Sequence, residues 1–196
     1  MARKEKVLSV NLHRAGYAKE SPVVREISFH LNRGEIVGLI GPNGSGKSTV
    51  IKAIVGLLGH VEGEISFPGG DKTYAYIPEQ PVFYDDLTVG WTANFAGKFY
   101  SDWDGAAFNE LLTRFGVDKT KKIKQLSKGM RMKTALAIAL SHRPEFLILD
   151  EPTAGLDPKG RDEILGQIKD LHRERGMTII LVSHSMEDIA KLVDRI

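Results

Sequence analysis

Short apolar runs of strand length alternate along the chain with segments whose apolar residues recur at helical spacing. The strand-like runs occupy residues 7–12, 27–31, 35–40, 63–67, 73–77, 146–149 and 177–182. The continuous runs at 35–40, 146–149 and 177–182 are typical of strands that are buried on both faces of a parallel sheet. A helical pattern at 48–58 follows the third run. This alternation predicts an α/β protein with a mainly parallel core sheet.

The middle of the chain has a different pattern. Residues 88–100, 104–115 and 129–141 show helical spacing and are separated by short breaks. We therefore expect one domain over residues 1–196, with a core formed by 1–86 and 142–196 and a helical subdomain inserted at about 87–141. In the first of these helices, Trp91, Phe95 and Phe99 are spaced to form one buried face. Phe83 and Tyr84 precede the helix on a loop and are expected to be exposed.

Composition narrows the function classes. Hydrophobic residues make up 42% and charged residues 27% of the chain, which is ordinary for a globular domain. The net charge is only +2, so nucleic acid is not the expected partner. The chain has no cysteine, which excludes disulfides and thiolate metal sites.

Two features bear on the membrane. The basic N-terminus, Met1-Ala2-Arg3-Lys4-Glu5-Lys6, is not followed by an apolar stretch of signal-peptide length. Apolar runs such as 135–140 are too short to cross a bilayer. If the protein acts at a membrane, we expect another chain to supply the spanning part.

A phosphate-binding loop follows the strand at 35–40. The segment Gly41-Pro42-Asn43-Gly44-Ser45-Gly46-Lys47-Ser48-Thr49 matches the pattern G-x-x-x-x-G-K-[ST]. The glycines allow backbone N–H groups to approach phosphate, and the start of the next helix offers further N–H groups to the same anion. Lys47 is expected to contact the terminal phosphates and Ser48 to ligate Mg²⁺. The alternative is a glycine-rich turn without a ligand.

Two carboxylates end the buried strand at 146–149. Asp150 and Glu151 lie at the carboxyl edge of the predicted parallel sheet, where such folds bind ligands. Asp150 is expected to hold Mg²⁺, and Glu151 to act as general base toward the attacking water. A solvated strand end is the alternative interpretation, and the phosphate loop argues against it.

Further motifs resemble the nucleotide-binding domain of ABC (ATP-binding cassette) ATPases over essentially the whole chain. Leu126-Ser127-Lys128-Gly129-Met130 resembles the family signature, usually LSGGQ, at the start of a helix. Ser127 and Gly129 are retained, so phosphate binding should survive. Lys128 and Met130 depart from the pattern, and the contact of the family's glutamine is in doubt. Such signatures are similar to those of some bacterial exporters. A plain N-cap at Ser127 is the alternative.

Four single residues extend the resemblance. Gln80 is similar to the Q-loop glutamine that reaches Mg²⁺ and water. Asp157 lies in a segment similar to the D-loop at the dimer interface and also suits an N-cap before Pro158. His184 resembles the switch histidine that contacts the γ-phosphate and holds Glu151. Tyr17 occupies the place of the adenine-stacking aromatic. Each of these residues also has an ordinary structural alternative.

The resemblance implies a set of partners and ligands. It implies ATP and Mg²⁺ as cofactors, an N-terminal antiparallel β portion, and a dimer with a second ABC domain, identical or not. It also implies a membrane-spanning transporter subunit, which would dock in a groove lined by residues 80–87 and the helix at 88–100. The domain is then expected to be cytoplasmic and peripheral on the inner face of the membrane. Family domains usually continue past Ile196, so a trimmed or recombined end is expected.

The leading interpretation is therefore the ATP-hydrolysing subunit of an ABC transporter. A soluble, non-transport ABC ATPase is one alternative, although the short interval between Lys47 and Asp150 leaves no room for the long coiled coil of DNA-repair members. An engineered or recombined ABC domain with weak turnover is the other. The transported substrate and the direction of transport are not encoded in this chain.

Overall fold

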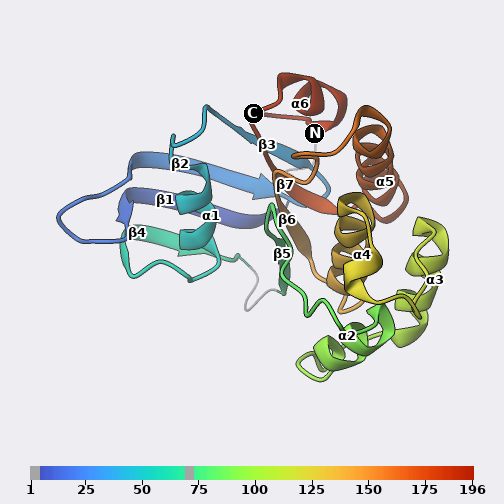
Figure 1. The fold of residues 1–196 in the computed structure, drawn as a ribbon. Coiled ribbons are helices and arrows are strands. Elements are labelled where there is room, and N and C mark those ends of the chain that lie inside the picture. The colour runs from blue at the N-terminus through green and yellow to red at the C-terminus, as the bar shows by residue number, and fades with distance from the viewer. Residues whose placement is uncertain (1–4, 69–72) are drawn as a thin grey trace.

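A computed structural model describes residues 5–68 and 73–196 (Figure 1). Residues 1–4, the start of the N-terminal segment Met1 to Lys6, lie outside the described residues. The first sheet has three antiparallel strands in the order β2-β1-β4. They are β1 (Lys6–Gly16), β2 (Val24–Asn32) and β4 (His60–Ser66). The antiparallel portion that the family resemblance implied is therefore present.

The second sheet is entirely parallel and has the order β3-β7-β6-β5. Its strands are β3 (Ile36–Ile40), β5 (Tyr74–Ile77), β6 (Phe146–Asp150) and β7 (Thr178–Ser183). Alternate residues face opposite sides: Ile148 packs with the antiparallel sheet and α1, whereas Leu149 packs toward the helices on the other face. Because both faces are covered, the strands are mostly apolar, with polar residues only at the ends of β6 and β7, and the predicted fold class is confirmed.

Helices cover both faces of the parallel sheet. They are α1 (Lys47–Ile54), α2 (Val89–Gly97), α3 (Gly105–Phe115), the 3₁₀ turn η1 (Ile123–Gln125), α4 (Lys128–Leu140), α5 (Pro158–Arg175) and α6 (Met186–Leu192). The segment from α2 to α4 falls between β5 and β6, as expected, and gathers at one end of the molecule (Figure 1). Its behaviour as a separate subdomain stays a prediction.

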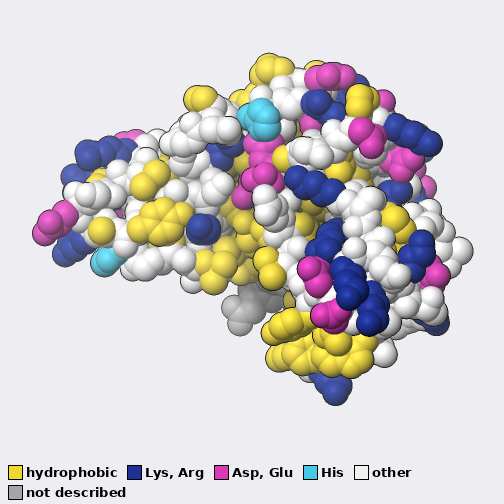
Figure 2. Space-filling model, viewed as in Figure 1, with side chains coloured by type: hydrophobic (Ala, Val, Ile, Leu, Met, Phe, Trp, Pro, Cys, Tyr) yellow, Lys and Arg dark blue, Asp and Glu magenta, His cyan; other side chains and the backbone are white. Residues whose placement is uncertain are grey.

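The aromatic face of α2 is exposed, so the prediction of a buried face was wrong. Trp91 is 48% and Phe95 43% exposed, and Phe99, just beyond the end of the helix, is 71% exposed. The rings of Trp91 and Phe95 stack at a centroid distance of 5.3 Å, and Phe99 meets Phe95 edge-on at 5.2 Å. The helix instead buries Val89 and Ala93. Small side chains allow close packing, so the bulky rings are left on the outer side. Figure 2 shows the resulting hydrophobic patch over α2.

The loop before α2 also differs from the prediction. Phe83, expected to be exposed, is half-buried against the core of the helical side, whereas Tyr84 is 72% exposed as expected. Together with Val82, Tyr100 and His142, Phe83 lines a groove of about 530 Å³ between β5 and α4. Of the two loop aromatics, Phe83 therefore contributes packing and Tyr84 is available for contact.

Candidate functional site

The loop between β3 and α1 has a backbone that only glycine tolerates at two positions. Gly44 and Gly46 have φ values of 81° and 96°, in the left-handed region. A Cβ at Gly46 would also lie 2.8 Å from the Val24 side chain. Gly46 is the N-cap of α1, so the strain-free left-handed turn places the start of that helix beside the loop. This is the strand–loop–helix arrangement that phosphate binding requires.

Lys47 is folded back over its own loop. Its Nζ donates hydrogen bonds to the carbonyl oxygens of Gly41, at 2.6 Å, and Pro42, at 3.1 Å. The residue is only 9% exposed. The cation is therefore largely removed from water and held by neutral carbonyl oxygens, which phosphate oxygens can replace with stronger, charge-assisted bonds.

The loop opens on a cavity of about 340 Å³. Its lining comes from four separate segments: Val23, Asn43, Gly44, Gly46, Lys47, Ser48, Thr49, Glu79, Asp150 and Glu151. Most of the predicted phosphate-loop residues and both predicted carboxylates are thus brought together, although β6 follows the loop by about a hundred residues of sequence. Gly41, Pro42 and Ser45 shape the loop behind this lining, where a Cβ at Gly41 would meet the Ser45 hydroxyl.

Asp150 and Ser48 offer a site for a hard cation. The Ser48 hydroxyl hydrogen-bonds to Asp150, and the Tyr76 hydroxyl lies 3.4 Å from Asp150 Oδ2. Burial raises the pKa of Asp150, and the nearby charges of Glu151 and Glu79 raise it further. Oxygen ligands of this kind are those that Mg²⁺ prefers, and a cation here would offset the cost of the buried carboxylate. The residues present therefore fit Mg²⁺.

Glu151 and His184 are in direct contact. His184 Nδ1 lies 2.9 Å from Glu151 Oε2, and the Ser183 hydroxyl donates to the same oxygen at 3.4 Å. The backbone of Glu151 has φ 49°, uncommon for a residue other than glycine, and its N–H donates to the Val182 carbonyl oxygen at 2.9 Å. Such strain costs free energy and is typical of functional positions. The predicted base and switch histidine thus form one unit at the cavity.

The Q-loop prediction is only partly matched by the geometry. Glu79, which the sequence argument did not single out, lines the phosphate cavity. Gln80 lies instead with Lys128, Arg131 and Leu156 around a neighbouring cavity of about 360 Å³, which Glu79 also borders. The pattern along the chain could not show which of two adjacent loop residues faces the phosphate site. The role of Gln80 at Mg²⁺ stays a prediction.

Tyr17 lies beside α1 and is 60% exposed. Its hydroxyl accepts a hydrogen bond from Lys52 Nζ at 3.0 Å, and this bond lowers the pKa of the phenol. Lys52 also lies over the ring, 5.1 Å from its centroid. An exposed ring near the phosphate loop suits stacking with a base, and that role stays a prediction.

The signature and D-loop residues surround a second cavity, of about 320 Å³. Ser127 is the N-cap of α4 and accepts from the Met130 N–H at 3.3 Å, and Asp157 is the N-cap of α5 and accepts from the Gly160 N–H at 2.7 Å. Gly129 lines the same cavity as these two residues. Among the described residues, this lining shares no member with that of the phosphate cavity. Within one chain, the signature and the phosphate loop therefore face different spaces.

The fold and this site define a P-loop nucleotide-binding domain. The family model described as "ABC transporter" matches residues 24–154, which is more than half of the chain. The chain is 41% identical to the linearmycin resistance ATP-binding protein LnrL of Bacillus subtilis and 40% identical to the energy-coupling factor transporter ATP-binding protein EcfA2 of Clostridium tetani, over 92% of this chain in each case. The protein therefore belongs to the ABC transporter ATP-binding family.

A solved structure agrees with this assignment. The structure titled "Structure of ATP binding subunit of ABC transporter" superposes with a TM-score of 0.81 at 31% identity, over 96% of this chain and 83% of that one. The chain spans 62% of the length of LnrL and 71% of that of EcfA2. In the described parts of the chain, no helix is long and apolar enough to span a bilayer.

Proposed function

We propose that this chain is the motor domain of an ABC transporter, which binds and hydrolyses MgATP and transmits the resulting closure to a membrane-spanning subunit. The observation that carries the proposal is the convergence of Lys47, Ser48, Asp150 and Glu151 on one cavity, with His184 in contact with Glu151. A phosphate-binding loop, a cation site and a base beside it are the parts that phosphoanhydride hydrolysis requires.

Each residue has a distinct role in turnover. Lys47 would exchange its carbonyl partners for phosphate oxygens. Ser48 and Asp150 would hold Mg²⁺, whose charge would offset that of the phosphates. Glu151 Oε accepts a proton from the attacking water, and His184 orients that carboxylate through the 2.9 Å contact. The carboxylate of Glu79 adds a further negative group to the cavity, so the site favours phosphate only when a cation is bound.

A complete site needs a second domain. Because Ser127 and Gly129 border a different cavity from Lys47, they are available to the nucleotide of a partner, identical or not. The free N–H groups at the start of α4 suit a γ-phosphate. The exposed cation of Lys128 in this exporter-like signature adds to that attraction. The D-loop residue Asp157 lies on the same face and would meet the partner.

The membrane subunit docks on the helical side in this proposal, which places the domain in the cytoplasm on the inner face of the membrane. The groove beside Phe83 and Tyr100 and the exposed rings of Trp91, Phe95 and Phe99 offer an apolar surface there. Exposed aromatic side chains are common interface anchors. A non-transport ABC ATPase would also hydrolyse ATP, but no membrane protein would co-purify with it, and this difference separates the two functions.

Two variants test the proposal together. In Lys47→Ala, the Kd for a fluorescent ATP analogue should rise roughly 10- to 100-fold, because a charged hydrogen bond contributes about 1.5–3 kcal/mol. In Glu151→Gln, binding should persist while phosphate release falls about 100-fold or more, because an amide cannot accept the proton of water. Unchanged binding in the first variant, or unchanged turnover in the second, contradicts the assignment.

A further inference from the structure

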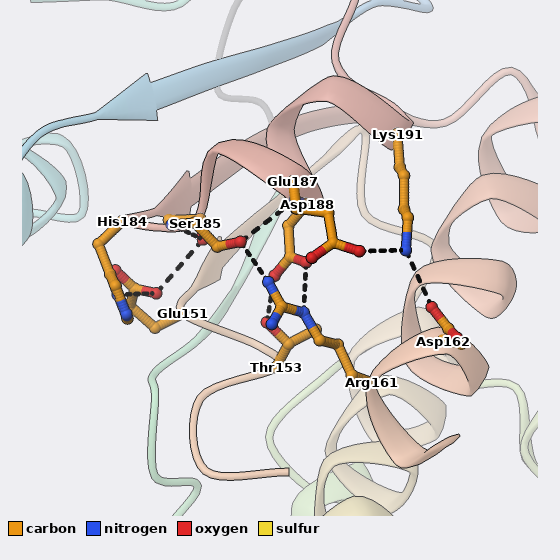
Figure 3. A network of polar contacts seen from close by, with 10 residues as sticks. Glu151, Thr153, Arg161, Asp162, His184, Ser185, Glu187, Asp188 and Lys191 are labelled. Carbon is orange, nitrogen blue, oxygen red and sulfur yellow. Dashed lines mark hydrogen bonds and ion pairs between the residues drawn. The ribbon is translucent and has the colours of Figure 1, made fainter. Parts of the chain in front are cut away.

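An ion pair between the half-buried Arg161 and the buried Asp188 joins the helix after the D-loop to the segment that carries His184 (Figure 3). Asp188, on α6, is 1% exposed and uses both carboxylate oxygens. Oδ1 accepts from Arg161 Nε at 2.6 Å, and Oδ2 accepts from the Thr153 hydroxyl at 2.5 Å. Thr153 is two residues beyond Glu151. One carboxylate therefore links the turn after the catalytic glutamate, the first turns of α5 and helix α6.

The contacts continue from Arg161 to the catalytic pair. A second guanidinium nitrogen, Nη2, donates to the Ser185 hydroxyl. The Ser185 N–H donates to Ser183 Oγ at 3.0 Å, and Ser183 Oγ donates to Glu151 Oε2 at 3.4 Å. Since Ser183 and Ser185 flank His184, the backbone on both sides of the histidine is fixed by the same chain of hydrogen bonds.

The other end of the network is the D-loop. The Arg161 N–H donates to the Asp157 carbonyl oxygen at 2.9 Å, so Arg161 lies one helical turn beyond the residue that caps α5. A displacement of the D-loop moves the start of α5 and with it the guanidinium. Separating the two side chains would leave the buried Asp188 carboxylate without its guanidinium partner, which is energetically costly. We therefore expect Arg161 and Asp188 to move together.

We infer that Arg161 and Asp188 are positioning residues, which hold His184 and Glu151 in register and transmit the position of the D-loop to them. The inference rests on the proposed ATPase function. Neither side chain lines the phosphate cavity among the described residues, so both act through Ser183, Ser185 and Thr153 and not through the nucleotide. When the D-loop is displaced, Glu151 and His184 lose their alignment, whereas the phosphate loop keeps its conformation.

A second ion pair between the same two helices supplies the control. Lys191 Nζ, on α6, lies 3.1 Å from Asp162 Oδ1, on α5, and both side chains are exposed. Figure 3 shows this pair beside the Arg161–Asp188 pair. It joins α5 to α6, but within residues 5–68 and 73–196 no chain of hydrogen bonds leads from it to Glu151 or His184. If only the contact between α5 and α6 matters, breaking either ion pair should lower kcat to the same extent. If Arg161 and Asp188 position the catalytic residues, only breaking their pair should lower kcat.

The test compares Arg161→Met, Asp188→Asn, their double variant and Arg161→Lys with the control Asp162→Asn. Thermal melts by circular dichroism check folding, a fluorescent ATP analogue gives Kd, and phosphate release gives kcat and KM. Mutation of a residue that orients a metal-binding side chain typically lowers activity about tenfold or more, and we expect a similar effect for residues that orient Glu151 and His184. We expect that fall in kcat for Arg161→Met and Asp188→Asn, with Kd unchanged and with the double variant no worse than either single one. Arg161→Lys, which keeps the charge but loses the fork, should be intermediate, and the control should match the wild type.

Several outcomes overturn the inference. One is a folded Arg161→Met variant whose kcat equals that of Asp162→Asn; another is a rise in Kd that matches the fall in kcat. If Asp188→Asn does not fold, Arg161→Lys decides the matter: a kcat equal to that of the wild type contradicts positioning by the guanidinium fork. A wild-type protein that binds no ATP and releases no phosphate contradicts the proposed function itself. Failure of the inference alone leaves the wild type active.

Discussion

At the scale of single residues, the site combines one cation with several carboxylates. Lys47 is nearly buried among neutral carbonyl oxygens, and Asp150 is buried close to Glu151 and Glu79. Both arrangements are unfavourable without a ligand and become favourable with MgATP, because each charge then gains an opposite one. These charges are therefore expected to lower the free energy of unfolding of the nucleotide-free protein, and MgATP binding is expected to raise it.

Asp150→Asn tests this statement. Burial holds the folded-state pKa of Asp150 above its ordinary value, so the native protein binds this proton more readily than the unfolded chain. The contribution of Asp150 to the free energy of unfolding should therefore fall as pH rises above about 4. In EDTA at neutral pH, Asp150→Asn should melt a few degrees higher than the wild type while losing ATPase activity. A lower melting temperature would contradict the unfavourable burial of this carboxylate.

Motifs predicted the residues of the site only where chemistry requires a fixed spacing. Lys47 and Ser48 follow their glycines at a set interval, and Asp150 and Glu151 end an apolar strand, so sequence alone indicated them. Glu79 was missed because two adjacent polar residues on a loop look alike until the backbone is known. Arg161 and Asp188 were missed as a pair because their contact depends on how α5 and α6 pack, which no spacing reveals.

At the scale of elements, the strands were predictable and the orientation of α2 was not. Buried parallel strands such as β6 are apolar in a continuous run, here Phe146 to Leu149 before Asp150, and the glycine-rich phosphate loop follows β3 directly. For α2, helical spacing of aromatic residues indicated one face but not which side of the helix is buried. The side with Val89 and Ala93 packs inward, and the aromatic side is left exposed.

The exposed face of α2 gives a prediction about docking. Replacing both Trp91 and Phe95 by serine should release the domain from membranes that contain the co-expressed membrane subunit, because aromatic anchors often contribute about 2 kcal/mol or more each. ATP binding should persist, since neither ring lines the phosphate cavity. The matched control is Val61→Ser, an exposed hydrophobic position on β4. Retention of the α2 variant with membranes, at the level of this control, would place the docking surface elsewhere.

At the scale of the whole molecule, the two sets of residues assigned to the proposed ATP site line different cavities of one chain. The phosphate loop faces one, and the start of α4 with the D-loop faces the other. Two chains related by a two-fold axis can bring each signature to the partner's nucleotide. The sequence indicated this division only through the family resemblance, because the spatial separation of two motifs is a property of the fold.

A signature variant should separate binding from turnover. Ser127→Arg places a bulky cation at the start of α4, where it obstructs the partner's nucleotide. The Kd of the isolated chain for an ATP analogue should change less than about twofold, since Ser127 lies outside the phosphate cavity, whereas kcat should fall at least about tenfold. An equal loss of binding and turnover would mean that Ser127 serves the nucleotide of its own chain.

The most direct test of the composite site is the mass of the Glu151→Gln variant in solution. This variant should bind MgATP without hydrolysing it, so the closed pair of domains should persist. Size-exclusion chromatography with light scattering is predicted to give a monomer without nucleotide and a dimer of twice 21.7 kDa with saturating MgATP. A double variant with Ser127→Arg should remain a monomer in both conditions. A Glu151→Gln protein that binds ATP fully yet stays a monomer would contradict the two-chain site.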